Sequence, residues 1–418
     1  MTNPAPLVCL LTPGHVASTP RLIKNADALV EAGYRVHVIA GRHFAPAEPL
    51  DAEILSAAKW SYTLINSRSG PGVTARKLLR RVARRLIGIS PLATPLMAAY
   101  AHQPEIPRLA VAAARVGASF YFGHCLGGLP AAARAAHSCS VPYGFDAEDF
   151  HDAETTEAVR DRVERTMRRT LQVHYLSGCA LMTAASPLIA SQYAKIYGTR
   201  TATTILNVFP LSHAPAAPVE PGPISEQRPA RLYWFSQTIG PGRGLEAMVA
   251  ILARMRTPVL LQLRGFVSES YKASLTAVAK RATLARPIEF LSPGAPSEMA
   301  RLAAGAHLGL SIEESAPLNR DLCLTNKIFA YLLAGIPQLL TPTSAQRALA
   351  PELGQAARLI DPYSSEQCAA QLDDFISNSA ALVAARNSAW QLGQTRFNWE
   401  HEQRKLLAAM RTLFDSSE

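Results

Sequence analysis

The cysteines of this 418-residue chain follow none of the spacings that hold a metal or staple a small domain. There are six of them, and no two form a C-x-x-C pair. Neither a zinc site nor a disulfide scaffold is therefore expected, and scattered thiols of this kind fit a reducing compartment. No D-x-D sequence closes any expected strand either, so the chain gives no reason to expect a bound metal.

Long hydrophobic runs are also missing. No stretch reaches the roughly 20 apolar residues that a membrane-spanning helix needs. The N-terminus lacks the positive segment and the apolar run of a signal peptide, so we expect a cytoplasmic protein. Charged residues make up only 18% of the chain and apolar residues 48%, which is typical of globular domains with buried cores rather than of a disordered chain.

Acidic residues are too few to balance the basic ones. The chain has 42 lysines and arginines against 32 aspartates and glutamates, and its net charge is +10. This balance favours anionic partners, which include nucleotides, phospholipid surfaces and nucleic acids. The charge by itself does not choose among them.

Short apolar runs alternate with segments of helical periodicity along both halves of the chain. We expect buried strands at residues 7–11, 35–40, 118–122, 141–145, 180–184 and 203–206, and again at 231–235, 259–263, 288–291, 307–312, 336–340 and 357–360. Helices are expected between these strands. Each half is therefore predicted to form a doubly wound, Rossmann-like α/β sheet.

A proline-rich stretch separates the two halves. Six prolines fall within residues 210–230 without any apolar periodicity, which is typical of a linker. We predict an N-terminal domain over residues 1–210, a linker over 211–230 and a C-terminal domain over 231–385. The helices expected over 386–418 would close the second domain and pack back toward the first.

The first loop of the N-terminal half carries a glycine, Gly14, and the next helix has Arg21 in its first turn. The dinucleotide fingerprint G-x-G-x-x-G is missing, and no acidic residue ends the second strand. A nicotinamide-dependent dehydrogenase is therefore disfavoured.

A histidine and an acidic cluster follow two successive strands of the first half. His124 comes after the strand at 118–122, and Asp146 and Glu148 come after the strand at 141–145. Because ligands of open α/β sheets bind at the carboxyl ends of the strands, these side chains should converge. They suit acid–base chemistry or the binding of sugar hydroxyls. Structural roles stay open, with His124 capping a helix and Asp146 acting as an N-cap.

The strongest basic cluster lies in residues 76–87. Six lysines and arginines interleave there with leucine, valine and isoleucine at helical spacing. Such a helix can lie on an anionic membrane surface, and it can equally be a surface helix packed on its domain by its apolar side. Nucleic acid is not expected as the partner, because no aromatic residues interleave with the arginines.

The loop at residues 236–244 is suited to an anion. Gly240 and Gly244 let the backbone approach a ligand closely, and Arg243 adds charge at the start of the next helix. Glycine-containing loops are common, however, and this loop by itself does not name a ligand.

A second helix start of this kind lies in the same half. Asn326 and Lys327 fall in the first turn of a helix expected over 325–334, where unpaired N–H groups and the helix dipole favour an anion. An ordinary solvated lysine is the alternative. Arg264 follows another strand and is expected at the same edge.

Residues 326–337, Asn-Lys-Ile-Phe-Ala-Tyr-Leu-Leu-Ala-Gly-Ile-Pro, resemble the nucleotide-sugar site of the family 4-like GT-B glycosyltransferases (glycosyl transferases group 1), whose pattern is N-K-[ILF]-x-E-Y-x-x-x-G-x-P. The likeness extends to 123–126 and 145–150 in the first half and to 236–244 in the second. Ala330 occupies the position at which the family has the acidic residue that holds the donor ribose.

This resemblance implies a GT-B fold, in which two doubly wound Rossmann-like domains face a central cleft. It implies a hexosyl- or related transferase of polysaccharide biosynthesis, which moves a sugar from a nucleotide-diphosphate sugar to an acceptor hydroxyl without a metal or cofactor. On this view Gly14 and Arg21 border the cleft on the acceptor side, and Arg21 contacts an anionic acceptor. The enzyme would be cytoplasmic, and peripheral on the inner face of a membrane if residues 76–87 bind lipid.

The resemblance also implies roles for the candidate residues. Arg243 and Lys327 would stabilise the departing diphosphate. His124 would orient the sugar, and Asp146 or Glu148 would assist the acceptor hydroxyl. Glu313 and Glu314 close the strand at 307–312 and are the acids placed to contact donor hydroxyls in place of Ala330.

Two other functions stay open. A sugar-nucleotide epimerase has the same two-domain layout and would need no acceptor. A catalytically silent binding subunit is the other, because Ala330 removes the family's acidic residue. The donor, the acceptor, the stereochemical course and the oligomeric state are not readable from these patterns.

Overall fold

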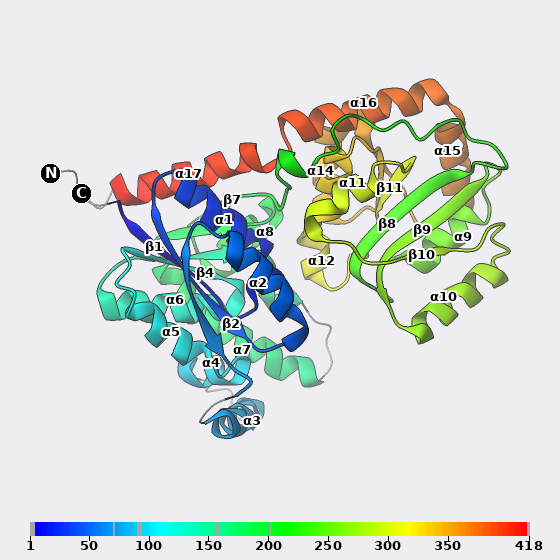
Figure 1. The fold of residues 1–418 in the computed structure, drawn as a ribbon. Helices are drawn as coiled ribbons and strands as arrows, with labels where there is room; N and C mark the ends of the chain where they lie inside the picture. Colours follow the sequence, from blue (N-terminus) through cyan, green and yellow to red (C-terminus); the bar gives the residue numbers. More distant parts are fainter. Residues whose placement is uncertain (1–4, 70–71, 90–93, 155–158, 201, 416–418) are drawn as a thin grey trace. The chain divides into compact units, whose positions relative to one another are not determined.

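The computed structural model describes residues 5–69, 72–89, 94–154, 159–200 and 202–415. The chain divides into two compact units (Figure 1). Unit 1 comprises Met1–Ile205, Pro317–Asn319 and Gln403–Glu418, and unit 2 comprises Leu206–Ala316 and Arg320–Glu402. Each unit is built around its own parallel sheet.

Within the described residues, the sheet of unit 1 has seven parallel strands in the order β3-β2-β1-β4-β5-β6-β7. The strands are β1 (Leu7–Thr12), β2 (Arg35–Arg42), β3 (Ser61–Asn66), β4 (Phe120–His124), β5 (Tyr143–Ala147), β6 (Leu181–Ala184) and β7 (Thr203–Thr204). The order reverses beside β1, so the carboxyl ends of β1 and β4 lie at the topological switch point, where open α/β sheets bind ligands.

Helices cover both faces of this sheet (Figure 1). They are α1 (Pro20–Glu31), α2 (Glu48–Ala57), α3 (Val73–Ile89), α4 (Pro95–His102), α5 (Ile106–Ala114), α6 (Cys125–Cys139), α7 (Val159–Tyr175) and α8 (Pro187–Tyr197). The final helix, α17 (Trp399–Asp415), begins in unit 2 and ends in unit 1. There the ring of Phe414 lies 5.6 Å from that of Tyr34 and 6.4 Å from that of Phe120.

The described part of unit 2 holds a six-stranded sheet in the order β10-β9-β8-β11-β12-β13. Its strands are β8 (Ala230–Ile239), β9 (Val259–Val267), β10 (Glu289–Leu291), β11 (Leu308–Ser311), β12 (Gln338–Leu340) and β13 (Ala357–Leu359). Its helices are α9 (Leu245–Leu252), α10 (Glu269–Arg281), α11 (Met299–Ala303), α13 (Asn326–Leu333), α14 (Ser344–Leu353), α15 (Ser365–Ser377) and α16 (Ser379–Thr395), and α12 (Leu318–Leu322) runs from unit 1 into unit 2. The doubly wound architecture expected for both halves is confirmed.

Three local expectations were wrong. β8 continues to Ile239 and β9 to Val267, so part of the expected loop at 236–244 is strand and Arg264 lies inside β9 rather than after it. These extensions pair with one another beyond an irregularity in the register. β3 had no counterpart in the sequence patterns, because it is an edge strand whose residues are mostly exposed or half-buried.

No helix among the described residues combines the length and the apolar character needed to cross a bilayer. None of the six cysteines, which all lie within the described residues, forms a disulfide.

Candidate functional site

A tight strand-to-helix turn places His124 at the carboxyl edge of the unit 1 sheet. β4 ends at His124, and α6 starts at the next residue, Cys125, whose φ of 58° lies in the left-handed region. A Cβ at Gly123 would lie 2.5 Å from the backbone of Gly128, so only glycine lets α6 pack this closely against the strand. The imidazole of His124 is fully buried there.

Arg21 and Asp146 form a buried ion pair at the same edge. The Nε and Nη2 of Arg21 donate to the two carboxylate oxygens of Asp146 at 2.8 and 2.7 Å, and its Nη1 donates to the carbonyl of Ile205 at 2.8 Å. Thr183 also donates to the carboxylate. Burial opposes the charge of Asp146, but the charge and hydrogen bonds of Arg21 hold the pKa of this carboxyl well below its usual range.

Both residues have surroundings that differ from those expected from the sequence. Arg21 is 2% exposed and is engaged inside the unit instead of pointing outward toward an acceptor. Asp146 lies within β5, so it is not an N-cap. Their assigned roles toward an acceptor stay predictions.

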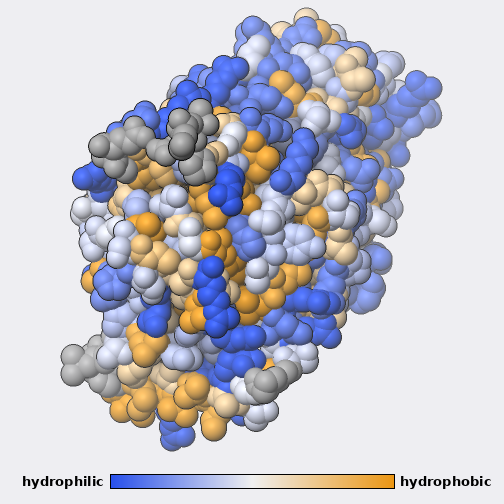
Figure 2. Space-filling model, turned by 60° about the vertical axis from the view of Figure 1, so that its left-hand side comes forward, coloured by the Kyte–Doolittle hydropathy of each residue, from blue (hydrophilic) through white to orange (hydrophobic). Residues whose placement is uncertain are grey.

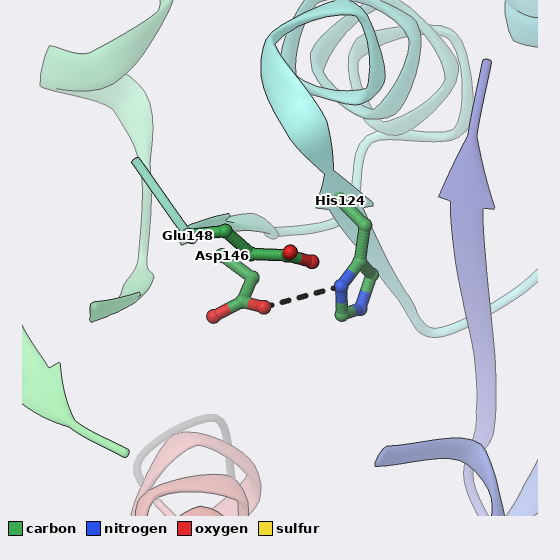
Figure 3. Close-up of side chains that lie close together, drawn as sticks. All are labelled: His124, Asp146 and Glu148. Carbon is green, nitrogen blue, oxygen red and sulfur yellow. Dashed lines mark ion pairs between the residues drawn. The ribbon is translucent and has the colours of Figure 1, made fainter. Parts of the chain in front are cut away.

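Glu148 lies two residues beyond Asp146 and turns toward His124 (Figure 3). His124 Nδ1 is 3.2 Å from Asp146 Oδ2, but the contact lacks hydrogen-bond geometry, and neither ring nitrogen has a hydrogen-bond partner among the described residues. Glu148 Oε1 is buried and also has no partner among them. Burial first, and then repulsion by Asp146, raises the pKa of Glu148 to about 7.

The three side chains offer ligand atoms that all lie within 4.8 Å of one another. A cation there would compete with Arg21, whose guanidinium already occupies both oxygens of Asp146. The donor set therefore suits hydrogen bonding to a hydroxyl-rich ligand better than metal binding. That the protein needs no metal stays a prediction.

Gly14 lies in the loop between β1 and α1. Its N–H donates to Thr12 Oγ1 at 3.2 Å, and its carbonyl accepts from the N–H of Gly41 at 2.9 Å. A Cβ at Gly41 would lie 2.1 Å from the carbonyl oxygen of Pro13, so the loop and β2 are pressed together. A contact between Gly14 and an acceptor stays a prediction.

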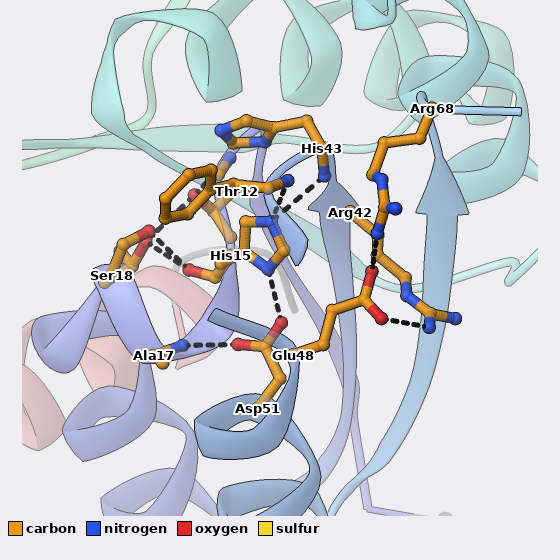
Figure 4. A network of polar contacts seen from close by, with 12 residues as sticks. Thr12, His15, Ala17, Ser18, Arg42, His43, Glu48, Asp51 and Arg68 are labelled. Atoms are coloured by element: carbon orange, nitrogen blue, oxygen red, sulfur yellow. Dashed lines mark hydrogen bonds and ion pairs between the residues drawn. The ribbon is translucent and has the colours of Figure 1, made fainter. Parts of the chain in front are cut away.

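A buried histidine fixes the same loop (Figure 4). His15 Nε2 accepts hydrogen bonds from the backbone N–H groups of His43 at 3.0 Å and Phe44 at 2.8 Å. Its proton must therefore sit on Nδ1, which donates to Asp51 at 2.5 Å. This network ties the β1–α1 loop to the segment after β2, and it shapes the edge at which His124 lies.

In unit 2, the carboxylate of Glu313 contacts two of the predicted basic side chains. Lys327 Nζ donates to Glu313 Oε1 at 2.6 Å and lies 5.3 Å from the centre of a Trp234 ring. Arg243 Nη1 lies 3.5 Å from Glu313 Oε2. Thr341 Oγ1 bonds both the N–H and the carbonyl of Glu313, at 2.8 and 2.7 Å, so the carboxylate is held in place. The expected roles of Arg243 and Lys327 at a diphosphate, and of Glu313 at donor hydroxyls, stay predictions.

The charge of this group, which we call the Glu313 cluster (Arg243, Glu313, Arg320 and Lys327), is not balanced. Burial opposes the ionisation of Glu313, but the charges of Lys327, Arg243 and Arg320 lower its pKa. Arg320 also donates to the carbonyl of Gly242 in the glycine loop. Two cations thus contact one carboxylate, and a third lies near it. The excess is positive even when Glu314 is counted, whose carboxylate lies near Gly242.

The glycine loop itself is shaped for close approach. Gly242 has a φ of 71° and Gly244 a φ of 73°, values that other residues rarely adopt, and Gly244 is the N-cap of α9. A Cβ at Gly240 would meet no atom within 4 Å, so this glycine leaves open space beside the loop. The N-terminus of α9 and the cluster therefore offer N–H donors and positive charge together.

Two other predicted residues have different surroundings. Arg264 donates to Tyr233 Oη at 2.7 Å and to the carbonyl of Ser292 at 2.6 Å, and no described contact joins it to the Glu313 cluster. Asn326 is exposed at the start of α13. Ala330, in the same helix, is fully buried against aromatic side chains such as Tyr233 and Tyr331.

Sequence reasoning missed Arg320 and the pair His15–Asp51. Arg320 lies in a five-residue helix with no apolar periodicity, so nothing in its neighbourhood indicated a site. His15 and Asp51 are 36 residues apart, and only the close packing of the β1–α1 loop against α2 brings them together. The one available signal for His15 was its place beside Gly14.

The two doubly wound sheets, each with polar side chains at its carboxyl edge, have the GT-B fold. Solved structures of the same fold cover nearly the whole chain. HepE of Anabaena in complex with UDP-glucose is 16% identical, with a TM-score of 0.68, over 97% of this chain and 100% of HepE. The expected fold is therefore confirmed.

Two further structures give the same result. Sucrose-phosphate synthase from Thermosynechococcus elongatus is 14% identical, with a TM-score of 0.70, over 98% of this chain and 100% of that enzyme. A glycosyltransferase from Rickettsia africae is 11% identical, with a TM-score of 0.67, over 99% of each chain. No protein-family model and no curated protein sequence matches the chain.

Proposed function

We propose that the protein is a glycosyltransferase that moves a sugar from a nucleotide-diphosphate sugar to an acceptor hydroxyl. The observation that carries this proposal is the Glu313 cluster, whose excess positive charge lies beside the glycine loop. A diphosphate is the leaving group that such a cluster would stabilise as negative charge develops on it. The complex of HepE with UDP-glucose supports a nucleotide sugar as the ligand class.

In this proposal Glu313 is a positioning residue. It neutralises Lys327 in the free protein and keeps Lys327 and Arg243 close together. An arriving diphosphate can then accept hydrogen bonds from cations that are already in place, which reduces the cost of ordering them. Arg320 joins Arg243 and Lys327 as a third donor, and Arg264, Asn326 and Glu314 contact other parts of the donor.

Unit 1 supplies the acceptor chemistry in this proposal. His124 Nε2 has no hydrogen-bond partner among the described residues and can bind a sugar hydroxyl. Glu148, with a pKa of about 7, is the carboxyl suited to exchange a proton with the acceptor hydroxyl near neutral pH. Asp146 keeps its charge and orients His124. The reaction needs no metal in this account.

We also propose that the enzyme works in the cytoplasm, in polysaccharide biosynthesis, and meets its acceptor at the inner face of a membrane. The free thiols and the net charge of +10 support this location.

The donor is tested by thermal unfolding with UDP, GDP, ADP and their sugar conjugates. A ligand at 100 times its dissociation constant adds about 2.7 kcal/mol to the free energy of unfolding. We expect a clear shift with one nucleotide and its conjugates. If no compound in the set shifts the transition, the proposed donor site is refuted.

A catalytically silent binding subunit is the second candidate. The apolar burial of Ala330 favours it, because a carboxylate is absent where the resembling enzymes bind ribose. Such a subunit would show neither a nucleotide shift nor turnover. An epimerase would convert its nucleotide sugar with no acceptor present, which product analysis distinguishes from transfer.

A further inference from the structure

Helix α3 presents an unusually apolar surface to solvent. Of its 17 residues, only Ala83 and Ile87 are buried. Five large apolar side chains are exposed, namely Leu78 (59%), Leu79 (50%), Val82 (48%), Leu86 (46%) and Ile89 (74%). Figure 2 shows hydrophobic side chains gathered at the lower end of this face, where α3 lies. An exposed apolar patch of this kind marks a surface that binds a protein, a ligand or a membrane.

The basic residues of α3 fall into two rows with different surroundings. Arg76 pairs with Glu105 at 2.8 Å, and Arg84 pairs with Glu164. Arg80 Nε donates to a backbone carbonyl of α4 at 3.4 Å. These three residues, spaced four apart, form an inward row that attaches α3 to the rest of unit 1.

The second row points away from unit 1. Lys77, Arg81 and Arg85 are also spaced four apart, and all three are exposed. In the described part of the chain none of them forms an ion pair. Each precedes a member of the apolar row Leu78, Val82 and Leu86, so a basic stripe and an apolar stripe run side by side along the helix.

We propose that the outward face of α3 docks on an anionic lipid bilayer. The apolar stripe would enter the boundary between headgroups and acyl chains, and Lys77, Arg81 and Arg85 would contact anionic headgroups, as amphipathic helices do when they lie in the plane of a membrane. Because the inward row already holds α3 in place, the free energy of binding is not reduced by the cost of folding this helix. This inference does not depend on the reaction proposed above.

Other occupants fit the face less well. A nucleic acid would satisfy the basic stripe but offers nothing that takes up the apolar stripe, since its outer surface is phosphate. A second copy docked by the same face would bring two basic stripes together, and like charges repel. An anionic bilayer supplies negative charge and an apolar interior side by side.

The test uses the full chain and vesicles of phosphatidylcholine with and without phosphatidylglycerol. Each outward basic residue is expected to contribute about fivefold to the partition coefficient, so the triple variant Lys77→Gln, Arg81→Gln, Arg85→Gln should bind anionic vesicles about a hundredfold more weakly. A matched variant removes the same charge elsewhere on unit 1 through the exposed residues Arg35, Arg115 and Arg134. It should lose much less binding.

A second variant, Leu78→Ser with Val82→Ser and Leu86→Ser, tests the apolar stripe and should also weaken binding. Unchanged circular dichroism and thermal unfolding show that each variant is folded. Failure of the unaltered protein to bind anionic vesicles overturns the proposal, as does equal loss in the outward and the matched variants. Binding to duplex DNA, or self-association, that depends on the outward row in place of vesicle binding also overturns it.

Discussion

Each unit buries an ion pair at the carboxyl edge of its sheet, and the two pairs differ in how their charges are used. In unit 1, Arg21 spans both oxygens of Asp146 and its remaining nitrogen bonds a carbonyl. In unit 2, Glu313 pairs with Lys327 and Arg243, and Arg320 lies near enough to lower its pKa, so positive charge is left over. The charges of the first pair are closed on one another, whereas the second leaves cations that we propose bind an anion.

The comparison teaches that a buried basic residue is not by itself evidence for a binding site. The side chains of Arg21 and Lys327 are both nearly inaccessible to solvent. Arg21 comes after a glycine-containing loop, and Lys327 lies in the first turn of a helix. What separates them is whether the local acidic groups balance the local basic ones. Removing one partner should therefore affect stability in unit 1 and ligand binding in unit 2.

The largest expected effect is on stability in unit 1. Arg21→Ala leaves Asp146 buried without its main partner and should lower the free energy of unfolding by about 3 to 5 kcal/mol. Urea unfolding measures it. The double variant Arg21→Met, Asp146→Leu should be less destabilised, because no buried charge is left. A loss for Arg21→Ala of about 1 kcal/mol or less, as for an exposed pair, would contradict a closed buried pair.

The next effect is on turnover in unit 2. Lys327→Ala removes one cation from the diphosphate site and should reduce turnover by about a hundredfold to a thousandfold. Release of the nucleoside diphosphate measures it, with the acceptor or with water as a slow acceptor. Lys280→Ala, at an exposed position of α10, is the control and should leave turnover unchanged. Unaltered turnover of the Lys327 variant would remove this residue from the mechanism.

Glu148 gives a pH dependence. Its folded pKa of about 7 lies above the ordinary value of 4.5, so the fold favours the protonated carboxyl. The cost of ionisation is absent below pH 4.5, grows between pH 4.5 and 7, and is complete above pH 7. Glu148→Gln should therefore raise stability by on the order of 2 kcal/mol at pH 8, and by little at pH 4.5.

Thermal unfolding at both pH values measures this difference. Asp149→Asn, at the neighbouring carboxylate, provides the comparison. An equal effect of Glu148→Gln at both pH values would show that its carboxyl is not perturbed in the fold.

The smallest effect concerns Arg320. Loss of one charge-assisted hydrogen bond in Arg320→Ala should weaken binding of the nucleoside diphosphate by about tenfold, or about 1.4 kcal/mol. Binding of the corresponding nucleoside, which lacks phosphate, should not change. A similar loss for both ligands would mean that Arg320 shapes the loop through Gly242 and does not contact phosphate.

Periodicity was enough to predict the two doubly wound sheets, because their central strands are continuous apolar runs and their helices have one apolar face. It failed at β3 and at the extensions of β8 and β9, where exposed residues such as Thr238 and Phe266 are held by pairing with a neighbouring strand. Strand pairing is a tertiary property that a local pattern does not contain.

The candidate site was partly predictable for the same reason. His124, Asp146 and Glu313 lie within or just after the last residues of a strand, and Lys327 lies in the first turn of a helix, so the rule for strand ends predicted their places. Which charges neutralise each other was not predictable. The pairing of Arg21 with Asp146 spans 125 residues, and that of Lys327 with Glu313 depends on how α13 packs beside the segment after β11.

The most direct test of the excess positive charge in unit 2 is calorimetric titration of the unaltered protein with the nucleoside diphosphate that stabilises it most. The corresponding nucleoside is titrated for comparison, and the Arg243→Ala variant is titrated with the diphosphate. We predict saturable binding of the diphosphate, binding at least about tenfold weaker for the nucleoside, and a similar loss in the variant. Equal affinity for nucleoside and nucleoside diphosphate, or undiminished binding by the variant, would contradict the claim that the Glu313 cluster binds a diphosphate.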